Sequence, residues 1–414
     1  AGQRSAVPGA DAMNEYRPPL VFAAACLGLL LFGIVLTALG TVLPSITERF
    51  ALARTDGGTL FSVMSLGIMA ASVLFGPIVD RYGYRGLLSA AVALVFVGIE
   101  GIAFAASPAV LAAAVLLIGF GGGIINGGTN ALVADLSAGR RTAGLNLLGV
   151  FFGIGAFGLP LVLGLLLNSL GYTTVLAAMG IIVAIVFVYI LSIRFPAPKQ
   201  PQGFPLRDAV RLTRDPVILL LGLILFFESG MEITIGGWTA AYVNDVLALP
   251  GDRALYFLSL YWFGMTIARL ILGTVLSHLA TRRALIPSLA LAFIGAVLLL
   301  RAQTPLPAAL GVLLLGAGFA TVFPVVLGLV ADRYPHLSGT AFSFVLVMAL
   351  SGGTLLPLAT GILGDRYGLR ASLLIVPAAL VAAAATYLVV RSRLDTSPHA
   401  QPAAATTEQD VPAC

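Results

Sequence analysis

Two carboxylates four residues apart mark the first place where this sequence could do chemistry. Glu228 and Glu232 lie in a long apolar run and are followed by Gly236, Gly237 and Trp238. Positions four apart share one face of a helix, so both acids would point in the same direction. A carboxylate at membrane depth is costly and usually faces a cavity or a partner. The stretch is therefore a functional-site hypothesis if the chain crosses a membrane.

Composition predicts that it does. Hydrophobic residues make up 59% of the 414 residues and charged residues 10%, with a mean hydropathy of +1.02, whereas a soluble domain is about 25% charged. The length accommodates roughly a dozen spans of about 20 residues each. The apolar runs are continuous and do not alternate, which argues against a membrane β-barrel. The predicted fold class is an all-α membrane protein.

Twelve apolar runs are expected, six on each side of a basic, proline-containing stretch. They are expected at 20–44, 58–79, 86–106, 109–135, 142–167 and 172–195, and then at 216–246, 254–277, 283–301, 306–332, 338–363 and 370–391. The predicted organisation is a disordered cytoplasmic N-terminus (1–17), a six-helix bundle (18–195), a cytoplasmic linker (196–215), a second six-helix bundle (216–393) and a disordered cytoplasmic tail (394–414).

The basic residues predict orientation. The net charge is +5, but most Lys and Arg fall in short loops on one side, which fits the positive-inside rule and not phosphate binding. Both termini are therefore expected in the cytoplasm, in a bacterial-type cytoplasmic (inner) membrane, with lipid as a partner, no nucleic acid and a monomeric state. The first run is too long for a signal-peptide core and is expected to be retained.

Cysteine and histidine give no sign of enzymatic chemistry. Cys26 and Cys414 indicate no disulfide framework. The three histidines, His278, His336 and His399, have no metal-ligand spacing. We expect no enzyme activity, no metal and no cofactor other than a coupling ion.

An internal repeat relates the two halves at an offset of 197 residues. The offset carries Gly67 onto Gly264, and it also carries Gly119 onto Gly316. It carries residues 133–135 onto 330–332 as well, and several further glycines and prolines match without a gap. The chain is therefore expected to hold two six-helix halves in a parallel repeat, an organisation of transporters whose site lies at the repeat interface.

The repeat also sorts the polar residues inside the spans. Matching positions are mostly glycine, proline and loop charges, which indicate scaffold and hinge roles. The candidate ligand site is the set whose partners in the other half differ in type. This set is Glu228 (Leu31), Glu232 (Val35), Arg269 (Ser72), Asn126 (Phe323) and Asn130 (Leu327).

The loop after the second span carries a recognisable pattern. Gly76, Asp80, Arg81, Gly83 and Arg85 resemble the G-x-x-x-D-R-x-G-x-R signature of the major facilitator superfamily. With twelve spans, two halves and a basic linker, the likeness covers nearly the whole chain. It implies the twelve-helix major facilitator fold and alternating access. The charged residues would form a cytoplasmic cluster that steadies the outward-facing state.

A related copy follows the eleventh span. It comprises Gly361, Asp365, Arg366, Gly368 and Arg370, and it is expected on the opposite side of the membrane, as an inverted triplet within each half would give. We assign gating roles to both copies, the alternative being ordinary basic loop ends.

Several roles remain open for the asymmetric set. Glu232 is expected to be a protonatable coupling residue, or else a structural ion-pair partner of Arg269. Glu228 could share the coupling role or accept hydrogen bonds from substrate. Arg269 could be the counter-charge for either acid or a clamp for an anionic substrate.

The neutral polar candidates suit a sugar. Asn126 and Asn130 lie on one face of the fourth span and can both donate to and accept from hydroxyls, although the pair could equally bond helices together. Trp238 could stack on a sugar or anchor at the interface. The glycine pair before Trp238 could unwind its helix. Three weaker candidates are Glu100, Tyr261 and Trp262, the last two expected mainly as packing residues.

A finer resemblance enters at the acid pair. Glu232, Gly236, Gly237 and Trp238, followed by Tyr242, look like the E-x-x-I-G-[SG]-[WF] segment of the fucose/galactose/glucose symporter branch. That branch implies sugar uptake coupled to protons or sodium. Its other coupling carboxylates have no counterpart here, so coupling is assigned to Glu228 and Glu232. The rival functions are a proton-coupled drug or metabolite exporter and a non-transporting membrane sensor or scaffold.

Overall fold

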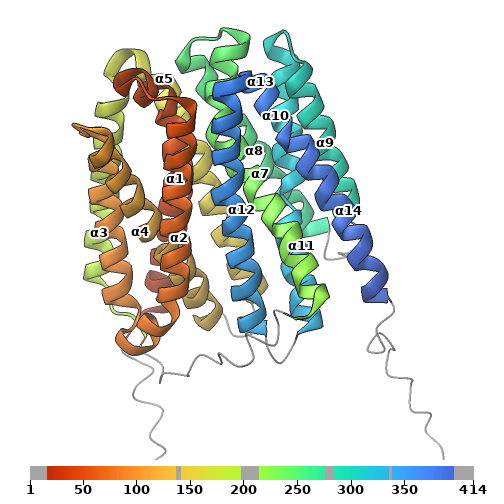
Figure 1. Cartoon of the computed structure of the whole chain (residues 1–414). Helices are drawn as coiled ribbons and strands as arrows, with labels where there is room; N and C mark the ends of the chain where they lie inside the picture. Colours follow the sequence, from red (N-terminus) through yellow and green to blue (C-terminus); the bar gives the residue numbers. More distant parts are fainter. Residues whose placement is uncertain (1–15, 137–140, 197–213, 276–283, 335–337, 396–414) are drawn as a thin grey trace, which may run out of the picture.

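The structure, a computed structural model, describes residues 16–136, 141–196, 214–275, 284–334 and 338–395. Within them every element of regular structure is a helix, and the helices run side by side in one bundle (Figure 1). The first half contains α1 (Pro18–Phe50), α2 (Arg54–Tyr82), α3 (Tyr84–Ala103), α4 (Pro108–Leu136) and α5 (Arg141–Ser192). The second half contains α7 (Pro216–Leu247), α8 (Gly251–Val275), α9 (Leu285–Arg301), α10 (Pro305–Phe319), α11 (Val322–Arg333), α12 (Ser338–Tyr367), α13 (Leu369–Ser372) and α14 (Ile375–Asp395).

The prediction of an all-α membrane protein is confirmed. In the described part of the chain, 10 stretches are long and apolar enough to cross a membrane. One of them covers two of the expected spans, because α5 turns a corner at Gly171. The expected span at 283–301 is represented by α9, an apolar helix of 17 residues. These two observations reconcile the count with the twelve expected runs.

The corners show why glycine recurs at fixed places. Gly171 has φ 71 and ψ 161, and Gly368, which ends α12, has φ 80 and ψ 160. Only glycine enters this region without steric cost. The two residues are 197 positions apart, so the repeat reproduces the backbone conformation itself.

Contacts between helices inside the first half recur between the residues 197 positions later in the second half. A Cβ on Gly67 would meet the backbone of Leu116 at 2.8 Å, and one on Gly264 would meet Leu313, the residue that the repeat aligns with Leu116. Gly119 faces the Met64 carbonyl just as Gly316 faces that of Tyr261. Small residues let helix backbones approach closely in membranes. The matched glycines are therefore packing residues of the two halves.

One end of the bundle is anchored by Asp215. This residue precedes α7, and its carboxylate accepts a hydrogen bond from the backbone N–H of Val217 at 2.8 Å. The hydroxyl of Tyr334, just after α11, donates to the same carboxylate at 2.7 Å. Burial and then this hydrogen bond raise the pKa of Tyr334. The contacts join the start of α7 to the end of α11 within the second half.

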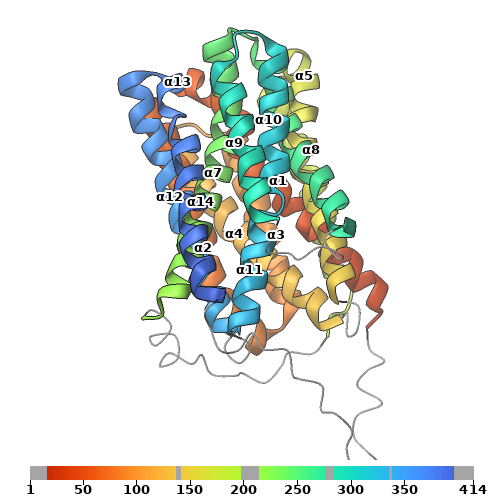
Figure 2. The same ribbon diagram turned by 90° about the vertical axis from the view of Figure 1, so that its right-hand side faces the viewer.

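The two halves meet along three helices of each half. α2 packs against α12, α5 packs against α8, and α1 packs against α7 and, less extensively, α8. The first turn of α1 and the last turn of α14 lie at one end of the bundle, which we call the terminal end, while α13 marks the opposite or far end (Figures 1 and 2). The halves are closed against each other at the far end, where Gly58 leaves room for the backbone of Leu358.

Candidate functional site

The acid pair lies in an unbroken stretch of α7. Glu228 is buried, with 1% of its surface exposed, and neither carboxylate oxygen has a hydrogen-bond partner among the described atoms. Glu232 lies one turn further along the helix and is half-buried. An ionised carboxylate without a partner is costly to bury. The site therefore needs a proton, a cation or a donor from a bound molecule at Glu228.

Three residues of α8 complete a polar cluster around these acids. Arg269 and Tyr261 interact electrostatically with both Glu228 and Glu232. The Tyr261 hydroxyl and the indole nitrogen of its neighbour Trp262 are buried without a described hydrogen-bond partner. Buried polar groups are normally paired. This group of five residues, which we call the α7–α8 cluster, is thus incomplete as it stands.

Arg269 is near the acids without touching them. No ion pair joins its guanidinium to either carboxylate among the described side chains. Its Nε instead donates to the Ala320 carbonyl at 3.4 Å, and its Cζ lies 5.8 Å from the ring centroid of Phe152. The structural ion pair considered from the sequence is not formed in this state.

The asparagines of α4 form a pair of their own. The Asn130 side-chain nitrogen donates to the backbone carbonyl of Asn126 at 2.8 Å and to its side-chain oxygen at 3.0 Å. Both residues are half-buried. Within the described residues no hydrogen bond links them to the α7–α8 cluster. The structure brings the two amides together but leaves them apart from the acids.

Trp238 lies at the interface of the halves, away from water. It is 2% exposed, its indole N–H donates to the Pro357 carbonyl at 3.3 Å, and its ring lies 6.0 Å from that of Phe61 in α2. The preceding glycines, which could have unwound α7, do not do so, since the helix continues from Pro216 to Leu247. Gly40 of α1 lies directly against the Gly236 carbonyl, and a Cβ on Gly236 itself would meet the Trp262 ring at 3.1 Å.

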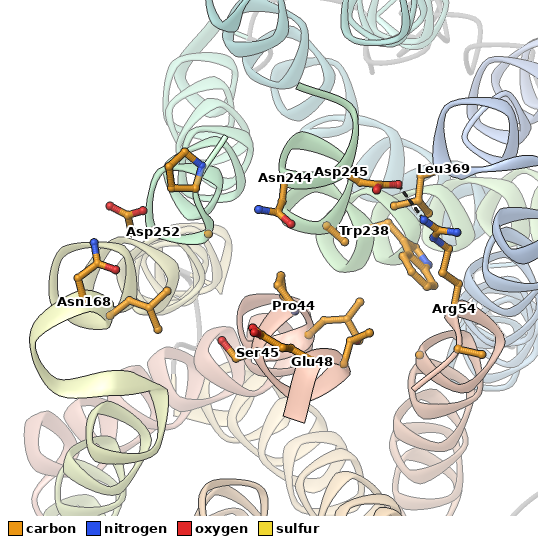
Figure 3. Close-up of a pocket in the computed structure, with 18 residues that line it drawn as sticks. Pro44, Ser45, Glu48, Arg54, Asn168, Trp238, Asn244, Asp245, Asp252 and Leu369 are labelled. Carbon is orange, nitrogen blue, oxygen red and sulfur yellow. Dashed lines mark hydrogen bonds and ion pairs between the residues drawn. The ribbon is translucent and has the colours of Figure 1, made fainter. Parts of the chain in front are cut away.

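A cavity of about 690 Å³ opens at the far end, on the outer side of Trp238 (Figure 3). Both halves line it. Glu48 of α1 and Asn168 of α5 face Asn244 of α7 and Asp252 of α8 across the opening. The wall beside the indole carries an ion pair across the two halves, in which Arg54 meets Asp245 at 2.8 Å.

Asp365 of α12 makes further contacts between the two halves at the far end. Its two carboxylate oxygens accept hydrogen bonds from the backbone N–H groups of Arg54 and Thr55, at 2.9 and 2.8 Å, and from the Thr55 hydroxyl at 2.6 Å. The first N–H groups of a helix lack intrahelical partners. The residue before α2 is Ala53, whose side chain cannot cap them. An acid from the second half thus caps a helix of the first, and we call these contacts the far-end latch.

We expect Asp365→Ala to destabilise the closed far end. Loss of a capping carboxylate costs about 1 kcal/mol, which is roughly a fivefold change in the ratio of closed to open molecules. A maleimide that cannot cross the membrane, added on the side of the far end, should then label Ser62→Cys about five times faster in a background lacking Cys26 and Cys414, because Ser62 is buried between α2 and α12. Asp252→Ala, which removes an acid from the same cavity, is the matched control. Equal labelling rates in both variants would contradict the latch.

The first motif copy lies at the end of α2 and at the corner that follows it. Gly76, Asp80 and Arg81 lie within α2, but their side chains are outside the described part of the chain. Gly83 forms the corner between α2 and α3, with φ 77 and ψ 175.

The arginines of the two motif copies brace corners inside their own halves. Arg85 donates to the Leu191 carbonyl near the end of α5, and Arg370 donates to the Ala302 carbonyl after α9 at 3.0 Å. Arg366 is exposed. The contact across the halves comes from the acid of the second copy, Asp365.

Sequence reasoning missed several residues at these sites. Tyr261 and Trp262 were expected mainly as packing residues, yet both carry unpartnered buried polar atoms. Phe152 was not expected at the site, although the repeat pairs it with Ala349. When only the polar residues of the two halves are compared, a difference between an aromatic and a small apolar side chain is not detected. Arg54 and Asp245 lie at helix ends, outside the membrane depth at which polar side chains were compared.

Glu100 is excluded from the cluster by its position. Its carboxylate lies directly over Gly180 in α5, so that a Cβ there would collide with it. Both residues belong to the first half. This acid lies between α3 and α5, away from the interface of the halves.

Known proteins resemble the chain over most of its length. Bypass of stop codon protein 6 of Saccharomyces cerevisiae is 25% identical over 305 residues, which are 64% of this chain and 59% of that protein. The chain thus spans less than two thirds of the yeast protein. An uncharacterized MFS-type transporter of Yersinia pestis is 22% identical over 324 residues, which are 77% of this chain and 83% of that protein.

Solved structures share the fold. A point mutant of the nucleoside transporter NupG superimposes with a TM-score of 0.76 at 15% identity, covering 90% of this chain and 99% of that one. A D-xylose–proton symporter gives 0.74 at 16% identity, covering 89% and 96%. The family pattern of the Major Facilitator Superfamily matches residues 25–357 and 257–411. With both halves included in that match, the chain belongs to the Major Facilitator Superfamily.

Proposed function

We propose that this protein is a secondary active transporter that moves a small polar solute, a sugar, across the cytoplasmic membrane. Transport proceeds by alternating access and is coupled to a proton or sodium ion, with both termini in the cytoplasm and the monomer as the working unit. The observation that carries the proposal is Glu228, a buried carboxylate whose two oxygens lack partners among the described atoms. The fold alone does not require an acid here, since the repeat places Leu31 at the equivalent position.

The coupling role follows from the surroundings of the acid pair. Glu228 and Glu232 interact with each other and with Arg269, so a cation that neutralises one acid changes the field at the other two groups. Arg269 lies beside Phe152 of the first half. A change of charge in the second half is therefore felt at the boundary along which the halves move. This is the arrangement that a coupling site needs.

The far-end contacts stabilise one of the two conformations that alternate during transport, the one in which the far end is closed. Asp365, Arg54 and Trp238 hold or fill the boundary at that end, whereas the terminal ends of α4 and α11 show no comparable packing within the described residues. We assign this state to a transporter closed on the outside. Opening would require the latch and the glycine contacts to separate.

The neutral polar groups of the spans suit a sugar. The paired amides of Asn126 and Asn130 and the free indole N–H of Trp262 offer donors and acceptors for hydroxyl groups. The motif from Glu232 to Trp238 adds its likeness to sugar symporters. Among structures with this fold are a D-xylose–proton symporter and a nucleoside transporter.

One observation favours a second candidate. Three aromatic rings, those of Phe32, Phe152 and Trp262, follow one another at centroid separations of 5.7 and 5.9 Å, the first pair tilted and the second edge-to-face, and Trp262 belongs to the α7–α8 cluster. An aromatic wall beside carboxylates also suits a lipophilic cation. A proton-coupled exporter of such compounds is therefore the alternative.

A thermal-shift screen separates these candidates. We expect a sugar to raise the melting temperature of the purified protein, with a shift that depends on pH or sodium, because a ligand stabilises the state that it binds. At a hundred times its Kd the ligand would contribute about 2.7 kcal/mol. Stabilisation by lipophilic cations alone would favour the exporter. Counterflow of the stabilising solute in liposomes is the second measurement, and its absence would indicate a non-transporting sensor or scaffold.

A further inference from the structure

Arg269 is held by two groups, neither of them an acid. Its Nε donates to the Ala320 carbonyl at 3.4 Å. That carbonyl is available because Pro324, four residues later, has no N–H to donate to it. The helix is interrupted at this point, between the end of α10 at Phe319 and the start of α11 at Val322.

The second group is the ring of Phe152, which comes from the other half of the protein. The Arg269 Cζ lies 5.8 Å from its centroid, within the range of a cation–π contact. The ring is 8% exposed and is packed between Phe32, at 5.7 Å, and Trp262, at 5.9 Å. The guanidinium thus lies against a firmly held aromatic face.

Two glycines fix the position of this ring. Gly33 in α1 has no room for a Cβ, because the Phe152 carbonyl lies against it. Gly153, the next residue in α5, has none because of the Thr266 side chain in α8. Substitution at either glycine would move α5. The ring therefore reaches Arg269 only while α5 and α8 are in close contact.

Neither partner is required by the fold. The repeat pairs Phe152 with Ala349 and Arg269 with Ser72. Matched packing residues such as Gly119 and Gly316 are the same in both halves. The aromatic ring and the guanidinium are thus a specialised pair at one boundary.

We propose that Phe152 is a positioning residue that holds Arg269 off the acid pair while the far end is closed. When the halves separate there, the ring withdraws and Arg269 pairs with Glu228 or Glu232. Neutralisation of the acids by a cation and closure of the far end then favour each other, by reciprocal linkage. The inference rests on the proposed coupling role of the acids.

The charged and ionisable groups that interact with Arg269 belong to α7 and α8. Glu228 and Glu232 of α7 interact with each other and with Arg269 of α8, and all three interact with Tyr261 of α8. From α5 the contact is the aromatic ring of Phe152, and from the α10–α11 break it is a backbone carbonyl. A cation bound at the acids is taken up from one side and released to the other, so the protein returns to its starting charge while the charge of the cation crosses the membrane.

The test measures how closure of the far end depends on pH and sodium. Spin labels at Asn168→Cys and Asn244→Cys, on opposite sides of the far-end cavity, report the closed fraction in a background lacking Cys26 and Cys414. In the parent, acidic pH or added sodium should increase the closed fraction. Phe152→Leu, which removes the ring face and keeps the apolar bulk, should reduce that dependence roughly three- to tenfold, the size of a cation–π contact.

Matched variants make the test specific. Phe152→Tyr keeps the ring and should restore the parent profile. Phe157→Leu makes the same change in α5 at another aromatic contact between the halves, 5.6 Å from Phe263, and should leave the dependence unchanged. In an Arg269→Gln background, Phe152→Leu should have no further effect on it.

The outcomes separate the two claims. A Phe152→Leu profile equal to the parent, or an equal flattening by Phe157→Leu, would overturn the positioning role. The coupling role would still stand if Glu228→Gln with Glu232→Gln abolished the dependence. A parent whose closure ignores both pH and sodium would overturn the coupling role and the inference together.

Discussion

Glu232→Gln is expected to abolish ion-driven accumulation of substrate while leaving solute exchange partly intact. The amide keeps the size and hydrogen-bonding capacity of the side chain but cannot bind and release a cation. The accumulation ratio in liposomes carrying an ion gradient should therefore fall to roughly one, because coupling is lost while both conformations survive. The measurement is uptake of the solute identified by thermal shift, with and without the gradient.

A matched control exists within the first half. Glu100→Gln removes an acid that lies over Gly180 and away from the interface, and it should leave accumulation near the parent value. Glu228→Gln, tested beside it, decides which member of the pair carries the cation. Full accumulation by the Glu232 variant would remove that residue from the coupling role.

Gly40→Ala is expected to prevent closure of the far end. A Cβ at this position would strike the Gly236 carbonyl and would come within 2.9 Å of the Gly237 backbone. Backbone atoms of two packed helices cannot yield as a flexible side chain would, and overpacking costs about 1–3 kcal/mol. The closed state should become roughly five- to a hundredfold rarer, with a matching loss of transport.

The readout is maleimide labelling of Ser62→Cys, which is buried between α2 and α12, from the side of the far end; labelling should become fast and insensitive to substrate. Gly158→Ala is the control, because nothing lies within 4 Å of a Cβ there. The Gly40 variant should still fold, since the conflict arises between the halves and not inside either one. Normal transport by Gly40→Ala would show that the far-end contacts are not part of the cycle.

The fold class could be predicted from the sequence because it depends on the length and hydrophobicity of whole segments and not on single contacts. Long apolar runs specify spans whatever their partners, and the offset of 197 residues appears again in the backbone, at Gly171 and Gly368 and in the paired glycine contacts. The interruption at Ala320 was not expected, because a proline near the middle of a span is tolerated in membrane helices. Its effect depends on Arg269, a distant residue that donates to the freed carbonyl.

The candidate site could be predicted only in part. Comparing the halves selected Glu228, Glu232 and Arg269, which the structure gathers into one cluster. It also selected Asn126, which lies outside that cluster, because asymmetry reveals specialisation but not location. Contacts between the halves, such as Asp365 with α2, have no sequence pattern, since they join residues about 310 positions apart.

Coupling of a cation to solute movement by the acid pair can be measured as cation flux that is driven by the solute. Protein in liposomes receives a gradient of the solute alone, and a dye inside reports proton or sodium entry. We expect cation entry with the parent protein and none with Glu228→Gln combined with Glu232→Gln, although that variant still exchanges solute. Solute movement by the parent without any cation, or undiminished cation entry with the double variant, would exclude the coupling role of the acids.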